Sequence, residues 1–340
     1  CHHLAPAAVV SLLAAGADVG ITDIRDLTAL NYLLARGYDE RDGIEMTTFW
    51  MLLKQMLYFG ATLEAKLDQT KGTYNRFLDV VNREFKSGNV DNLRFIVTFH
   101  HPAHQIHPEI LNAKKIRSIR KAFPPKPLLT PKDIHSRIWF PAIHRAYHID
   151  PVPIVSAGSL HSAADRSIVS RGVLGATMAN KRKHFAILEM LLEEKVVDVN
   201  AVDDKLRSAL SLSIDYGSVV LVQLLVKHGV DVNKIIFTRW SEVTGLMFAC
   251  RSVFASGLVE AILKSPTVDL NVVDGLHRSA LDHAMIGSSD MRSYDSRNPE
   301  SVVDSYVASR NASFDPLLYL DPATGDGSNS QWDVVRLLIL

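Results

Sequence analysis

The chain has 340 residues, of which 47% are hydrophobic, and its 37 basic side chains balance 37 acidic ones. This length and composition exclude a disordered chain and allow one large domain or two ordinary ones. Zero net charge makes nucleic acid an unlikely main partner, because affinity for phosphate backbones needs a basic surplus. Two cysteines are too few for a disulfide framework, and no apolar run approaches the roughly 18 residues of a membrane span. We therefore expect a cytoplasmic protein without a membrane partner.

Three stretches of the chain share the spacing Asp-x4-Asp-x4-Ser/Thr-Ala-Leu. They begin at Asp18, Asp198 and Asp269, and a fourth stretch from Asp231 to Leu246 fits if its turn has three extra residues. A short apolar segment precedes each frame, with the spacing of a buried helix. The chain therefore contains an internal repeat, and the distance from Asp198 to Asp231 gives its period as 33 residues.

Each part of this frame has a physical role. Ser or Thr at the end of the frame predicts a helix N-cap, because its side-chain oxygen accepts a backbone N–H of the first turn. The predicted caps are Thr28, Ser208, Thr244 and Ser279. Glycine after each helix predicts a left-handed residue that ends it. These glycines are Gly16, Gly37, Gly60, Gly217 and Gly229.

These features resemble the ankyrin repeat, which has a period of about 33 residues and a T-P-L-H-x-A signature. The sequence departs from that signature where the proline is replaced, at Ala29, Ala209, Gly245 and Ala280. The resemblance implies an all-α fold, an ankyrin-like helical repeat solenoid with short β-hairpin turns and two long insertions. Repeats of this kind are stabilised by their neighbours. Both ends of the chain resemble interrupted repeats, so we expect a piece of a longer array.

The expected organisation has five parts. They are N-terminal repeats at 1–100 (degenerate after 37), a Pro/His/basic-rich insertion at 101–155, ankyrin repeats at 156–287, an acidic polar insertion loop at 288–330, and an interrupted second helix at 331–340. The first insertion holds nine of the 14 prolines, which disfavour long helices and paired strands. We expect it to be extended, with one short helix from Asn112 to Ala122.

The resemblance also implies where a partner would bind. Ankyrin-like proteins use the hairpin tips and first helices that line a concave face. Some of the partner-binding residues that the resemblance implies match the family's contact positions, and the others lie in the lengthened third hairpin. The implied residues are Arg25, Arg36, Asp204, Lys205, Arg207, Asp215, Tyr216, Arg239, Trp240 and Arg278. Aromatic and arginine side chains often dominate binding energy at protein interfaces. An alternative for Trp240 is that it folds back onto its own repeat.

Other functions find weaker support. Seven of the 14 histidines lie within 100–148, and the i,i+4 pairs His100/His104 and His144/His148 could share a metal on one helical face. Prolines interrupt that segment, however, and no H-E-x-x-H motif is present. The basic run from Lys114 to Lys121 is compatible with nuclear import, with anion binding, or with a solvated helix face.

The sequence contains neither G-x-S-x-G nor G-x-x-x-x-G-K-[ST]. We therefore expect a protein that is not an enzyme, that uses no cofactor and no metal, and that binds a protein partner through its concave face. Two alternatives stay open. One is a metal-binding or enzymatic domain centred on the histidine-rich segment at 100–148, and the other is a purely structural spacer.

Overall fold

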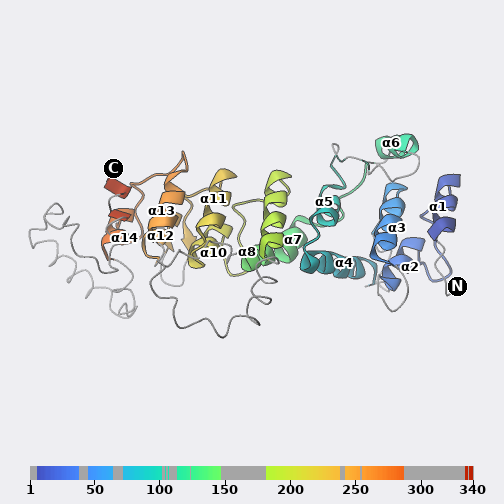
Figure 1. Ribbon diagram of the computed structural model, residues 1–340, viewed down its shortest axis with the longest axis horizontal. Coiled ribbons are helices and arrows are strands. Elements are labelled where there is room, and N and C mark those ends of the chain that lie inside the picture. The colour runs from blue at the N-terminus through green and yellow to red at the C-terminus, as the bar shows by residue number, and fades with distance from the viewer. Residues whose placement is uncertain are drawn as a thin grey trace, which may run out of the picture. The chain divides into compact units, whose positions relative to one another are not determined.

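A computed structural model describes residues 6–37, 45–63, 72–101, 104, 106, 113–122, 124–146, 181–237, 242–252, 255–286, 334–335 and 337–339 (Figure 1). The chain is mostly helical, as expected from the sequence. It divides into two compact units. Unit 1 comprises Cys1–Trp139 with Ala186–Val197, and unit 2 comprises Phe140–Phe185 with Asp198–Leu340.

Unit 1 is built from short helices. They are α1 (Pro6–Ala15), α2 (Ala29–Arg36), α3 (Met46–Tyr58), α4 (Thr73–Ser87), α5 (Val90–Thr98), α6 (Ala113–Ala122), α7 (Pro131–Ile134) and a π-helix (His135–Trp139). Helix α3 packs on α1 and α2, and α4 packs on α2, α5 and the π-helix. The apolar faces of these helices therefore meet in the core of unit 1.

A buried carboxylate joins three helices of unit 1. Glu84 of α4 is fully buried. It accepts hydrogen bonds from Trp50 Nε1 of α3 at 3.1 Å and from Asn92 Nδ2 of α5 at 2.9 Å. Because a buried polar group is costly unless it is paired, these bonds fix how the three helices lie against one another.

Unit 2 has two layers of helices (Figure 1). Its elements are α8 (Phe140–Ala146), α10 (Ala209–Asp215), α11 (Val219–Lys227), β1 (Ile236–Phe237), β2 (Glu242–Val243), α12 (Gly245–Cys250), α13 (Ala255–Leu263) and α14 (Ala280–Ile286). Helices α8, α10, α12 and α14 pack in sequence in one layer, and α13 packs on α11 in the other. The strands pair antiparallel, with Ile236 opposite Val243. Residues 181–193 form a further helix, of which residues 181–185 are assigned to unit 2 and residues 186–193 to unit 1.

The predicted helix ends are confirmed. Thr28, Ser208 and Thr244 each accept a backbone N–H from the third residue beyond them, at 3.1 to 3.4 Å. Ser279 does the same with Asp282 at 3.3 Å. All five predicted glycines have positive φ, as does Gly88, which the sequence analysis did not single out. Local chemistry thus sets the helix boundaries.

The segment at 101–155 differs from its prediction. Helix α6 confirms the short helix expected there, but the expectation that the rest is extended is wrong, because α7, the π-helix and α8 run from Pro131 to Ala146. Proline is compatible with this run at two places. Pro131 lies in the first turn after the N-cap Thr130, where its missing N–H is not needed. Pro141 follows a π-helical turn, which shifts the hydrogen-bond ladder around it.

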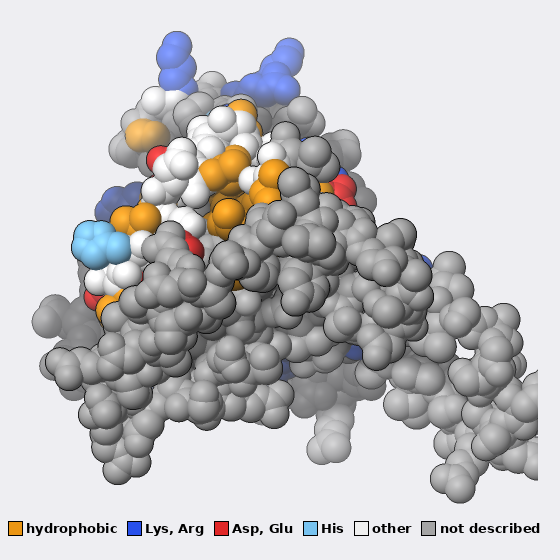
Figure 2. Space-filling view, turned by 90° about the vertical axis from the view of Figure 1, so that its left-hand side faces the viewer, with side chains coloured by type: hydrophobic (Ala, Val, Ile, Leu, Met, Phe, Trp, Pro, Cys, Tyr) orange, Lys and Arg blue, Asp and Glu red, His pale blue; other side chains and the backbone are white. Residues whose placement is uncertain are grey.

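The helices at 131–146 also contribute to the cores. Trp139 and Ile138 are fully buried in unit 1, and Ile143 of α8 is buried in unit 2. The predicted loop at 288–330 and residues 156–180 lie outside the described residues. Residues 334–335 and 337–339 are helical, as the sequence predicted. In the described part of the face shown in Figure 2, hydrophobic side chains are visible among polar ones. Ile339 is 63% exposed.

Candidate functional site

The three frames fold into the same turn. In each, the second Asp accepts backbone N–H groups from the residues two and four positions later. These bonds are 2.8 and 3.0 Å long at Asp23, 2.9 and 2.9 Å at Asp203, and 2.9 and 2.9 Å at Asp274. The backbone closes the turn as well, because each Asp N–H donates to the carbonyl four residues on. One aspartate therefore holds each turn closed from both its side chain and its backbone.

The third residue after this aspartate is left-handed in every frame. Asp26, Leu206 and His277 have φ values of 56°, 60° and 58°. Residues other than glycine adopt this conformation at a cost of roughly 1–2 kcal/mol. The turn keeps its shape without glycine, so its hydrogen bonds outweigh this strain.

Asparagine side chains link consecutive turns of unit 2. Asn200 Oδ1 accepts the backbone N–H of Asp231 at 2.9 Å, and Asn233 Oδ1 accepts that of Asp269 at 2.9 Å. Asn233 Nδ2 also donates to the Thr267 carbonyl at 2.6 Å. The turns therefore form a continuous, mutually bonded edge rather than separate loops.

Four of the residues nominated from the sequence are exposed along the turns and first helices. Arg25, Asp204 and Lys205 lie at turn tips, and Asp215 ends α10. Arg36, the last residue of α2, is half-buried. Arg239 and Trp240 lie outside the described residues. Asp204, Lys205 and Asp215 all belong to unit 2.

Arg207 and Arg278 are committed to pairs within their own turns. Arg207 donates from Nε and Nη2 to Asp203 Oδ2 at 2.9 and 2.7 Å, and Arg278 does the same with Asp274 at 2.9 and 2.7 Å. Burial alone would raise the pKa of both aspartates, but the hydrogen bonds from these arginines outweigh it and hold each pKa below its usual value. These arginines therefore stiffen the turns.

Tyr216 is half-buried and follows the last residue of α10, where it contacts α8. Its hydroxyl forms a hydrogen bond with Nδ1 of His144 in α8, and the two rings meet edge to face with centroids 5.8 Å apart. Burial lowers the pKa of His144, with a further contribution from Arg207. Tyr216 thus fastens α10 to α8, a contact that the sequence spacing did not reveal.

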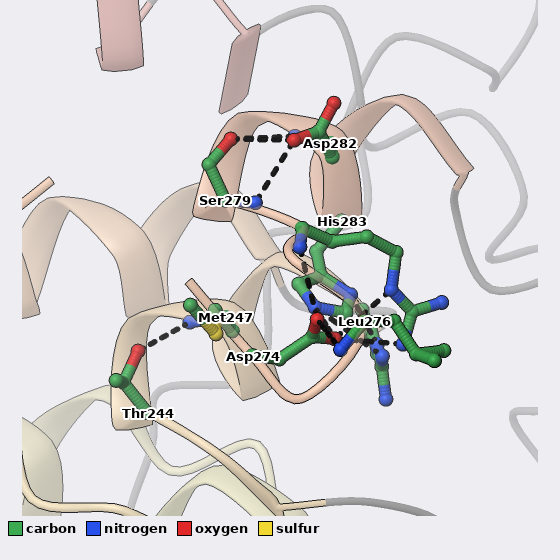
Figure 3. A network of polar contacts seen from close by, with 9 residues as sticks. Thr244, Met247, Asp274, Leu276, Ser279, Asp282 and His283 are labelled. Carbon is green, nitrogen blue, oxygen red and sulfur yellow. Dashed lines mark hydrogen bonds and ion pairs between the residues drawn. The ribbon is translucent and has the colours of Figure 1, made fainter. Parts of the chain in front are cut away.

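The most buried polar network of unit 2 surrounds His283 (Figure 3). Arg251 Nε donates to His283 Nδ1 at 2.8 Å, so the ring carries its proton on Nε2, which contacts Asp274 Oδ2 at 2.9 Å. Burial lowers the pKa of His283 to about 4, assisted by Arg251 and Arg278. Both ring nitrogens are therefore engaged, and the histidine serves packing and turn geometry rather than proton transfer.

Sequence reasoning missed the exposed apolar residues that the turns of unit 2 carry. The hairpin edge, as we name it, comprises the exposed turn residues of unit 2, and its large apolar members are Val202, Leu206, Ile235, Leu270, Val273 and Leu276. Leu206 is 55% exposed and Leu276 is 49% exposed. The signal available in the sequence was a large apolar residue within a turn framed by aspartates.

The structure contradicts one of the two histidine pairs suggested by the sequence, His100/His104. Helix α5 ends at Thr98, so His100 and His104 do not share a helical face. His104 uses both ring nitrogens, with Tyr58 Oη at 2.8 Å and Thr98 Oγ1 at 3.1 Å. His148 lies outside the described residues. Within the described part of the chain, no group of three or more His, Cys, Asp or Glu side chains could hold a metal ion.

Cys250 is not arranged as a nucleophile, because burial raises the pKa of its thiol to about 12.

Among the described helices, none combines the length and apolar composition that crossing a membrane requires. In the comparisons with known proteins, no family model matches the chain, and the search of curated proteins found no match.

Proposed function

We propose that the chain is a non-catalytic protein-binding module of the ankyrin-repeat type, and that its partner binds the hairpin edge of unit 2. The repeated frame, its period and the common geometry of the three turns support the repeat assignment. One observation carries the proposed function: large apolar side chains are exposed on turns that are themselves held rigid.

The rigidity of these turns matters for binding. Asp203 and Asp274 hold their turns through backbone and arginine hydrogen bonds. Asn200 and Asn233 join successive turns. A surface that is already ordered loses little conformational entropy when a partner binds, so more of the contact energy contributes to affinity.

The composition of the hairpin edge suits a protein partner. Leu206 and Leu276 offer apolar area that a partner would remove from water. Asp204 and Lys205 are exposed next to Leu206 and carry opposite charges. An apolar centre with a charged rim is the usual arrangement of a protein interface.

The experiment begins with capture of partner proteins on the immobilised full chain, followed by direct binding of each purified partner. The test variant is L206E/L276E, which places charge on the hairpin edge. The control variant is Leu281→Glu, which changes an exposed leucine of α14 outside the turns. We expect the test variant to lose more than about 2 kcal/mol of binding free energy, a factor of roughly 30, while the control keeps wild-type affinity.

Thermal unfolding of all three proteins accompanies the binding measurement, because a lowered melting temperature would indicate damage to the fold. If a captured partner binds L206E/L276E as tightly as the wild type, the hairpin edge is not the binding surface. If no protein binds the chain directly, the structural-spacer alternative replaces the proposal.

A further inference from the structure

Unit 1 contains a cavity of about 590 Å³ that the proposed function does not use. It lies at the C-terminal ends of α3 and α5, beside α6 and the segment 124–128. Its lining includes Tyr58, Leu63, Tyr74, Phe99, Ile119 and Leu128. The volume is within the range of roughly 300–1,000 Å³ that is typical of small-molecule sites.

The charged side chains that line this cavity are basic. Arg120 and Lys126 contribute to it, and no Asp or Glu occurs among the described residues of its lining. The aromatic hydroxyls are already engaged, since Tyr58 Oη bonds His104 at 2.8 Å and Tyr74 Oη donates to Asp133 at 2.7 Å. The cavity therefore offers apolar walls and positive charge.

Arg120 is the most unusual residue of the cavity. Its guanidinium lies over the rings of Phe99 and Tyr58, 5.0 and 5.8 Å from their centroids, and Nη2 donates to the Phe99 carbonyl at 2.7 Å. Nη1 is buried, and it has no hydrogen-bond partner in the part of the chain that the structure describes. Burial lowers the pKa of Arg120. A buried guanidinium donor without a partner is costly, and an anion placed against it would offset that cost.

The basic run of α6 has exposed cations and one cation, Arg120, that lines the cavity. Ile116 is fully buried and Ile119 faces the cavity, whereas Lys114, Arg117 and Lys121 are exposed. Arg120 is thus turned inward from an otherwise solvated basic helix face.

The part of the wall formed by the segment 124–128 is stiff. Pro124, Pro125 and Pro127 line the cavity, and the ring of each proline fixes its backbone φ. Leu128 and Leu129 anchor the end of this segment because both are buried, at 7% and 3% exposure. The cavity therefore needs little rearrangement to accept a ligand.

We propose that this cavity binds a small monocarboxylate with an apolar body. The carboxylate pairs with the guanidinium of Arg120, because a guanidinium matches the geometry and charge of a carboxylate. The apolar body packs against the rings of Phe99 and Tyr74 and against the proline segment. A neutral ligand of the same shape offers at most an uncharged acceptor and leaves the charge of the guanidinium uncompensated.

The test uses isothermal titration calorimetry of the full chain with laurate below its micelle concentration, and with dodecanol as the neutral analogue. We expect laurate to bind more tightly than dodecanol. Arg120→Met should weaken laurate binding by about tenfold or more while changing dodecanol binding little, because only the charged hydrogen bond is lost. The matched control is Arg117→Met, an exposed arginine on the same helix, which should leave both affinities unchanged.

A second variant guards against misfolding of Arg120→Met. Ala61 also lines the cavity, and Ala61→Phe would fill part of the space. It should weaken both laurate and dodecanol. The proposal is overturned if the wild type does not bind laurate, if dodecanol binds as tightly, if the two arginine variants behave alike, or if Ala61→Phe leaves both affinities unchanged.

Discussion

The turns at Asp23 and Asp274 share their backbone hydrogen bonds but differ in their surroundings. Asp23 is exposed, and its second oxygen contacts the Tyr32 hydroxyl, which is the main reason that its pKa is lowered. The Asp274 side chain is 2% exposed and is contacted by Arg278 and His283. Tyr32 and His283 occupy equivalent positions, because each lies nine residues after the aspartate of its turn. The frame therefore sets the turn, and the residues around it set how firmly it is held.

The largest expected effect comes from neutralising the buried aspartate. Asp274→Asn keeps an oxygen for the backbone N–H groups but leaves Arg278 without its counterion. We expect a loss of about 3 kcal/mol in the free energy of unfolding, because breaking a buried ion pair leaves an uncompensated charge. Urea unfolding followed by circular dichroism measures it. Asp23→Asn is the control and should shift the midpoint much less, and equal shifts would contradict the comparison.

A pH effect of similar size is expected from His283. Its pKa falls from the usual 6.5 to about 4 in the folded protein because burial and the nearby arginines disfavour the charged ring. The unfolded chain therefore binds more protons between these values, so stability is full above pH 6.5 and declines as pH falls toward 4. The total amounts to about 3 kcal/mol.

Urea midpoints between neutral pH and pH 4 test this expectation. His283→Gln should flatten the decline because the glutamine cannot titrate. His104 contributes a parallel decline from unit 1, since its pKa is also lowered to about 4, mainly by burial. A His283→Gln variant that loses stability with pH as steeply as the wild type would contradict the account of the network.

The contact between α8 and α10 should have an intermediate effect. Tyr216→Phe removes the hydroxyl that bonds His144 but keeps the ring, and we expect a loss of about 1 kcal/mol. Binding of a partner at the hairpin edge should change little. Unaltered stability together with weakened binding would instead return Tyr216 to the partner-binding surface that the sequence predicted.

The smallest effect concerns the left-handed turn residue. Leu206→Gly removes the strain at φ 60° and costs some entropy of the unfolded chain, so we expect a net gain of up to about 1 kcal/mol. Lys205→Gly changes a neighbouring residue that is not left-handed and should lower stability. Thermal unfolding of the two variants separates these outcomes, and a loss in both would contradict the strain argument.

The sequence predicted those features that depend on neighbours in the chain. Ser208 and Gly217 mark helix ends through local hydrogen bonds and backbone geometry, and both behave as predicted. It could not predict the roles that depend on distant residues. Arg278 matched a binding position by spacing, yet it pairs within its turn, beside a network that reaches Arg251. Proline density led to the wrong prediction for 131–146, because Pro131 and Pro141 lie where a helix tolerates them.

Hydrogen exchange of the full chain, with and without a captured partner, tests the proposed binding surface most directly. The account predicts that bound partner slows exchange at the turns 202–207 and 273–278, where Leu206 and Leu276 are exposed. Exchange in α11 and α13, which form the other layer of unit 2, should stay unchanged. Protection confined to α11 and α13, with none at the turns, would contradict it.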